Sequence, residues 1–200
     1  MTDHLAALDV RQVHAWYTRL ADMIARQTVP DGNRAASPVQ GTGPEGKDAM
    51  ELIRDDLDSA DVARLLQQHL DSAAELSPPE SVHALDLSAL RRPDITFWSV
   101  RAGGELLGCG ALKELDPGHG EIKSMRTAAG HLRRGVASTV LRRIVEEAKG
   151  RGYKRLSLET GAAAAFASAR ALYRRFGFEC CGPFGDYRED PHSVFMTLAL

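Results

Sequence analysis

Residues 121–150 read EIKSMRTAAGHLRRGVASTVLRRIVEEAKG and join a strand pattern to a helix pattern. We expect a β-strand over residues 120–127. From Val136 onward, apolar residues recur every three or four positions, which predicts an amphipathic helix that ends at Gly150 or Gly152. Its apolar stripe consists of Val136, Val140, Leu141, Ile144, Val145 and Ala148.

The loop between these two elements ends in Arg133-Arg134-Gly135-Val136-Ala137. Gly135 and Ala137 carry little or no side chain, so a ligand can approach the backbone closely. The first amides of a helix lack internal partners, and together with the helix dipole they form a site suited to a pyrophosphate. Arg133 and Arg134 add positive charge at its rim. The alternative is a plain helix start with solvated arginines.

The rest of the main domain alternates short strand and helix patterns. Ala102-Gly103-Gly104 is a good hairpin turn between strands at 97–101 and 105–112. Further strands are predicted at 51–54, 153–159, 178–181 and 194–198, and helices around 62–73, 81–90 and 166–176. This order predicts an α+β, or mixed α/β, domain with about six to seven strands in a largely antiparallel sheet and helices on both faces.

The chain divides near residue 50. Residues 5–27 have helical apolar spacing, and residues 30–48 have the composition of a flexible linker. We therefore expect an N-terminal helix and linker over residues 1–49 and the main domain over residues 50–200. A lone helix must dock on the main domain or on a partner. Alternatively, Met50 is the working start.

Composition excludes several classes of protein. There are 25 Lys and Arg residues against 27 Asp and Glu residues, which argues against a nucleic-acid partner. No stretch is apolar enough to span a membrane, and no secretory signal is evident. The three cysteines do not resemble a disulfide framework, which favours a cytoplasmic location. Histidines are scattered without the spacing of metal ligands, so no metal site is expected.

Four segments together resemble the GNAT superfamily of acyl-CoA-dependent N-acetyltransferases. They are residues 121–127, the run from Arg133 to Ala137, Leu-Glu-Thr-Gly at 158–161, and Ala-Leu-Tyr-Arg-Arg-Phe-Gly-Phe at 171–178. The resemblance covers roughly residues 50–200. The segments 77–83 and 182–196 are similar to a bacterial, YsnE-like subgroup.

The resemblance implies acetyl-CoA as co-substrate and a place for it. Gly135 and Ala137 match the last two fixed positions of the family's pyrophosphate loop, Q/R-x-x-G-x-G/A, whereas Leu132 stands where Gln or Arg is usual. The preceding strand residues Met125, Arg126 and Thr127 would bond the pantetheine arm through their backbone. In this fold two parallel strands splay apart at that point.

Catalytic roles are implied in the same way. Tyr173 matches the tyrosine that often protonates the leaving thiolate; the alternative is a packing tyrosine. The spacing of Glu121 to Gly135 matches a catalytic glutamate of histone acetyltransferase members, and the alternative is an edge-strand carboxylate facing water. Glu159 is a rival base. Phe166 replaces an Asn that often contacts the cofactor.

These observations favour an acetyl-CoA-dependent N-acetyltransferase that moves the acetyl group directly to a primary amine of a small-molecule or peptide acceptor. Residues 186–192 form an acidic, aromatic loop, which either attracts a cationic amine acceptor or is a solvated turn. Exposed strand edges in this fold often pair, so a homodimer is one expectation. Two alternatives are a degenerate acyl-CoA-binding module and an interaction protein that docks through its N-terminal helix.

Overall fold

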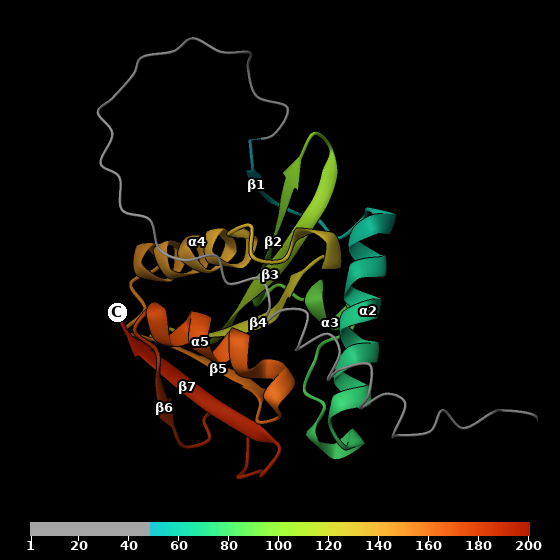
Figure 1. Ribbon diagram of the computed structural model, residues 1–200. Helices are drawn as coiled ribbons and strands as arrows, with labels where there is room; N and C mark the ends of the chain where they lie inside the picture. Colours follow the sequence, from blue (N-terminus) through green and yellow to red (C-terminus); the bar gives the residue numbers. More distant parts are fainter. Residues whose placement is uncertain (1–48) are drawn as a thin grey trace, which may run out of the picture. The chain divides into compact units, whose positions relative to one another are not determined.

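The computed structural model describes residues 49–200 (Figure 1). The predicted helix at 5–27 and linker at 30–48 lie outside these residues. The helices are α2 (Ala60–Leu76), α3 (Leu87–Leu90), α4 (Val136–Gly150) and α5 (Ala167–Arg175). The strands are β1 (Glu51–Arg54), β2 (Ile95–Ala102), β3 (Glu105–Asp116), β4 (His119–Thr127), β5 (Arg155–Gly161), β6 (Glu179–Cys181) and β7 (Ser193–Ala199).

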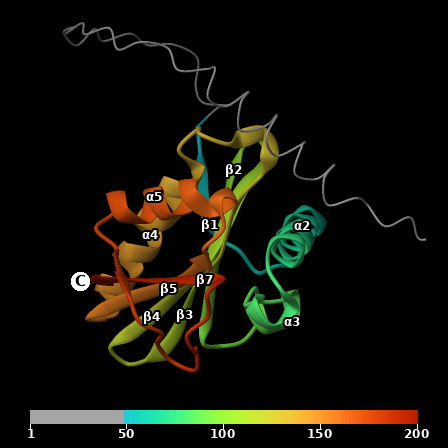
Figure 2. The ribbon, with the colours of Figure 1, turned by 60° about the horizontal axis from the view of Figure 1, so that its bottom comes forward.

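The seven strands form one sheet in the order β1-β2-β3-β4-β5-β7-β6. Only β4 and β5 pair in parallel, and every other neighbouring pair is antiparallel. Helices α4 and α5 lie on one side of the sheet and α2 and α3 on the other (Figure 2). The predicted mixed α/β class, with a largely antiparallel sheet and helices on both faces, is confirmed.

Two apolar cores follow from this layering. The predicted stripe of α4 packs with Leu112, Ile122, Leu156 and Leu158 of the sheet and with Tyr173 of α5. On the other face, Val62, Leu65 and Leu66 of α2 pack against Phe97, Cys109 and Ala111. Odd-numbered residues of the middle of β3 therefore face α2, and even-numbered ones face α4, as the alternation of a strand requires.

The predicted helix over residues 81–90 is largely wrong. A 3₁₀ turn at Pro79–Ser81 is followed by an extended segment, and only Leu87–Leu90 is helical. The helix starts late because the Asp86 carboxylate caps the Ala89 amide at 2.8 Å. Before it, the His83 carbonyl accepts a hydrogen bond from Lys123 instead of from a helical amide.

The parallel strands β4 and β5 part midway along their length. Their pairing runs from His119↔Arg155 to Ile122↔Leu158 and stops there, although β4 continues to Thr127 and β5 to Gly161. The β3–β4 register also shifts between Ala111↔Lys123 and Cys109↔Arg126.

This shift is a β-bulge, and Ser124 within it has a positive φ of 52°. A bulge bends its strand, so the bulge accounts for the parting of β4 from β5.

Candidate functional site

The helix α4 starts immediately after a left-handed residue. Gly135, its N-cap, has φ 87°, which a residue with a Cβ adopts only with strain. A Cβ at Gly135 would meet nothing within 4 Å, so the backbone conformation rather than crowding requires glycine here. The first amides of a helix have no partner within the helix, so whether those of α4 bind a ligand, as expected from the small residues Gly135 and Ala137, stays a prediction.

The loop before α4 is tied to the β2–β3 hairpin. Arg134 donates to His131 Nδ1 at 2.9 Å, and His131 Nε2 lies 3.0 Å from Glu105 Oε1. Since Nδ1 accepts, Nε2 carries the proton and donates to Glu105. Arg133 is exposed with φ 60°, and Leu132 is 59% exposed. The predicted loop residues thus lie together at the helix start.

Residues 123–127 of β4 lie beyond the last parallel pair, so their backbone edge toward β5 forms no sheet hydrogen bonds with it. Met125 packs against the core below α4, while Arg126 donates to Ser72 Oγ of α2 at 3.1 Å. The buried Ser124 Oγ makes no hydrogen bond among residues 49–200. Three predicted cofactor residues, Met125, Arg126 and Thr127, therefore lie along an open strand edge.

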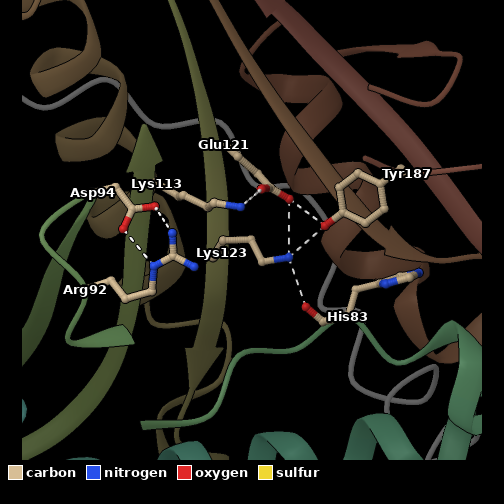
Figure 3. A network of polar contacts seen from close by, with 7 residues as sticks. All are labelled: His83, Arg92, Asp94, Lys113, Glu121, Lys123 and Tyr187. Carbon is tan, nitrogen blue, oxygen red and sulfur yellow. Dashed lines mark hydrogen bonds and ion pairs between the residues drawn. The ribbon is translucent and has the colours of Figure 1, made fainter. Parts of the chain in front are cut away.

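Glu121 is buried next to the point where the strands part. It is 2% exposed, so the alternative of an edge-strand carboxylate facing water is wrong. Its Oε1 accepts a hydrogen bond from the Tyr187 hydroxyl at 2.6 Å and lies 3.2 Å from Lys123 Nζ. Its Oε2 lies 3.8 Å from Lys113 Nζ. Figure 3 shows this network, with both lysines directed at the carboxylate.

Lys123 and Tyr187 fasten the β6–β7 loop to β4. Lys123 Nζ donates to the Tyr187 hydroxyl at 2.7 Å and to the His83 carbonyl at 2.9 Å. The Tyr187 ring contacts those of His83, Phe184 and Phe195. Burial and the charge of Glu121 raise the pKa of Tyr187, so its hydroxyl stays protonated. Within the loop predicted to be acidic and aromatic, Tyr187 turns inward while Asp186 and Glu189 are exposed.

Glu159 lies on β5, one residue beyond the last parallel pair. The register places Glu121 beside Ser157, so Glu121 and Glu159 project from the same face of the sheet. Glu159 is half-buried, and Ser193 donates a hydrogen bond to its Oε1 at 2.7 Å. Burial raises its pKa. The Glu159 carboxylate therefore takes up a proton more readily than an exposed carboxylate does.

Tyr173 reaches the same region from the other face. It is 6% exposed in the core below α5, edge-on to Phe178 at a centroid distance of 5.8 Å. Burial and the charge of Glu159 raise its pKa, so it is a phenol at neutral pH. Tyr173 packs in the core, and its hydroxyl is near enough to Glu159 for that charge to act on it.

The comparisons with known proteins agree with this geometry. The Acetyltransferase (GNAT) family profile matches residues 62–178, which span both sides of the parting and the start of α4. The chain belongs to the GNAT acetyltransferase family. It is therefore an acyltransferase by family, as predicted from residues 121–178.

Relatives of this GNAT protein are N-acetyltransferases. The chain is 62% identical over 151 residues to YsnE of Bacillus subtilis, described as an uncharacterized N-acetyltransferase; the match covers 76% of this chain and all of YsnE. It is 54% identical over 146 residues to YedL of Escherichia coli, described in the same words, covering 73% of this chain and 92% of YedL. The predicted subgroup is confirmed.

Among solved structures, a GNAT acetyltransferase from Elizabethkingia anophelis with acetyl-CoA bound matches with a TM-score of 0.54. It is 16% identical, and the match covers 76% of this chain and 98% of that one. At this identity the likeness concerns the fold, which is that of acetyltransferases.

The described residues do not support a metal site, a membrane-spanning helix or a cysteine nucleophile. In residues 49–200, no group of three or more His, Cys, Asp and Glu side chains is arranged to hold a metal ion. None of the helices in the same residues is long and apolar enough to cross a membrane. Cys109 is 1% exposed, and burial raises the pKa of its thiol to about 12, so it is a packing residue rather than a nucleophile.

Sequence reasoning missed Lys113, Lys123 and His83 as parts of the site. Alternation along β4 puts Glu121 and Lys123 on one face, and that signal was available in the sequence. The contact of Tyr187 with Glu121 joins residues 66 positions apart, and no local pattern reveals it.

Removing the charge of Lys123 should destabilise the protein. We expect Lys123→Met to lower the free energy of unfolding by about 3 kcal/mol, because Glu121 is then buried with only the more distant Lys113 as a cation. Urea unfolding measures this. The double variant Lys123→Met/Glu121→Gln should recover part of the loss; a double variant no more stable than Lys123→Met would contradict this account of the network.

Proposed function

We propose that this GNAT protein is an acetyl-CoA-dependent N-acetyltransferase that transfers the acetyl group directly to a primary amine. One observation carries the proposal: β4 and β5 part after Ile122↔Leu158, and two buried or half-buried carboxylates flank that point. The open strand edge leads toward the start of α4. This arrangement combines a strand edge that can bind an extended ligand with groups that can exchange protons.

The residues present fit acetyl-CoA. The left-handed Gly135 and the small Ala137 leave the first amides of α4 accessible for a pyrophosphate. Residues 123–127 pair with β3 on one edge only, and the backbone groups on their edge toward β5 can bond an extended pantetheine arm, as an added strand would. The unpartnered Ser124 Oγ supplies a further polar group at the bulge. Arg133 and Arg134 bring positive charge to the phosphate end.

Acetyl-CoA, when bound, supplies an acyl group activated as a thioester. An amine must be neutral to attack it, so the chain must accept a proton. Glu159 is the better placed direct acceptor, because Glu121 is 2% exposed and already bonded by Tyr187 and Lys123. In this proposal Glu121 positions the Tyr187 hydroxyl by accepting its hydrogen bond, and Glu159 contacts the amine.

Tyr173 would return a proton to the departing sulfur. A general acid must be protonated at the working pH, and the raised pKa of Tyr173 keeps it so. The backbone amides of the bulged segment around Met125 are candidates to stabilise negative charge on the thioester oxygen.

A second candidate is an acyl-CoA-binding module without turnover. It is favoured by the exposed Leu132 in the phosphate loop and by Phe166, whose ring packs against Gly161 at the end of β5. It differs from the first in releasing no CoA thiol with any amine. The interaction protein that docks through residues 1–49, a cytoplasmic location and a homodimer stay predictions.

The cofactor site is tested by placing a carboxylate at the start of α4. Calorimetric titration should detect acetyl-CoA binding to the unaltered protein and at least about 10-fold weaker binding to Ala137→Glu, since like charges repel. A glutamate in the first turn of a helix interacts favourably with the helix dipole, so the variant should fold.

The matched control is Gly150→Glu at the opposite end of α4, where a Cβ meets nothing within 4 Å. It adds the same charge and should bind acetyl-CoA normally. Equal weakening in both variants, or no binding to the unaltered protein, would refute the proposed cofactor site.

The proton acceptor is tested by Glu159→Gln. We expect kcat to fall by about 10²-fold or more. A base works when deprotonated, so the rate of the unaltered enzyme should rise with pH through the pKa of Glu159, which burial places above that of an ordinary carboxyl. The variant should lack this rise.

The control is the exposed Glu146→Gln on α4, which should keep both the rate and the profile. A Glu159→Gln enzyme that retains the pH-dependent rise would assign the base to another group.

A further inference from the structure

Arg126 lies on the stretch of β4 beyond the parting. Its register partner on β3 is Cys109, which packs in the core on the α2 side of the sheet. The Arg126 side chain accordingly extends toward α2 and reaches Ser72 Oγ at 3.1 Å. The face is the one from which Glu121, Lys123 and Glu159 project, so the guanidinium lies on the same side as the candidate proton acceptor.

The Arg126 guanidinium has no carboxylate partner in the part of the chain that the structure describes. A guanidinium carries five N–H donors, and its hydrogen bond here goes to a neutral hydroxyl. Arg101 pairs with Asp61, and Arg151 pairs with Glu147. The half-buried Arg170 also lacks a carboxylate partner, but it donates to two backbone carbonyls, those of Gly161 and Ala163, whereas the hydrogen bond of Arg126 goes to one hydroxyl. Burial of an unpaired charge is unfavourable. A ligand with a negative charge would therefore stabilise the half-buried guanidinium of Arg126.

Positive charges outnumber the free carboxylates on this face of the sheet. The Asp55 carboxylate acts on the Cys109 thiol together with Arg126, but it already accepts a hydrogen bond from Ser99. Lys113 and Lys123 share the single carboxylate Glu121, and the other carboxylate of this face, Glu159, is one whose protonation burial favours. On α2, His69 has its pKa lowered to about 4 by burial and by the charges of Arg126 and Lys123. His69 is therefore neutral at pH 7 and leaves the positive charge uncompensated.

We propose that Arg126 binds a carboxylate of the acceptor, so that the acceptor class is small amines that also carry a carboxylate. The inference rests on the proposed acetyl transfer and names its substrate class. Arginine binds a carboxylate through two parallel N–H···O bonds. The carboxylate of the acceptor binds the Arg126 guanidinium, and the amine of the acceptor points along β4 toward Glu159 at the parting.

The same charges disfavour a polyamine or a lysine-rich peptide as acceptor. Such a cation would meet Lys113, Lys123 and Arg126 on one face, where the Glu121 carboxylate is already shared between the two lysines. Like-charge juxtaposition suppresses wrong partners. A cationic acceptor is therefore the outcome that would count against this assignment.

The test compares each amino acid with its uncharged amide. The panel holds the common α-amino acids, β-alanine, 4-aminobutyrate and aminobenzoates, the amide of each, and spermidine. Turnover is followed as CoA thiol released from acetyl-CoA, and binding of each compound to the protein–CoA complex is followed by calorimetry. The unaltered enzyme should prefer at least one acid over its amide by about 10-fold or more in kcat/KM, as expected for a charge-assisted pair.

Variants then assign the preference to one side chain. Arg126→Gln should raise KM for the preferred acid by about 10-fold or more with little change for its amide. Arg126→Lys should recover part of the preference, because it keeps the charge but not the fork. The control Arg142→Gln removes an exposed arginine of α4 and should leave KM unchanged for both the acid and its amide. Calorimetric titration of each variant with acetyl-CoA separates an effect on the acceptor from one on the cofactor, because the β4 backbone, not the Arg126 side chain, is proposed to hold the pantetheine arm.

Several results would overturn the assignment. They are an unaltered enzyme that acetylates amides or spermidine as well as acids, an Arg126→Gln variant that affects acid and amide equally, and a panel in which no acid binds or reacts. Failure of the proposed function itself is separate: in that case acetyl-CoA does not bind, or no amine of any charge releases CoA thiol.

Discussion

Two neighbouring parallel strands that stop pairing expose backbone groups that a sheet normally satisfies, and the rest of this site depends on that exposure. Here β4 carries a bulge at Ser124, with φ 52°, two residues after Ile122, its last residue paired with β5. Polar backbone groups need partners. An extended ligand arm can take the place of the missing strand, and the first amides of α4 can hold its phosphates.

The buried network around Glu121 keeps the segments beside this opening in place. Burying a carboxylate costs several kcal/mol unless cations and hydrogen-bond donors offset the loss of water. Lys113 from β3, Lys123 from β4 and Tyr187 from the β6–β7 loop supply those partners, and the His83 carbonyl completes the coordination of Lys123. The Glu121 carboxylate therefore joins strands β3 and β4 to the β6–β7 loop, while Glu159 stays more accessible for proton transfer.

The sequence predicted what depends on local pattern. The apolar stripe of α4, the Gly103-Gly104 turn and the strand at 120–127 follow from spacing and backbone preference, and the structure confirms each. The positive φ of Gly135 explains why a glycine stands at the start of α4. What failed depends on distant contacts: the helix expected at 81–90 is interrupted because the His83 carbonyl bonds Lys123, 40 residues away. The burial of Glu121 under Tyr187 likewise needs the closed sheet and loop.

The central claim is that acetyl-CoA binds along the open edge of β4 and the start of α4. Amide hydrogen exchange of the unaltered protein, with and without acetyl-CoA, tests it directly, because it reports on backbone amides. The account predicts slowed exchange at residues 123–127 and 136–138 on binding, with little change in α2. Binding that leaves both segments unchanged, or protection confined to other strands, would contradict it.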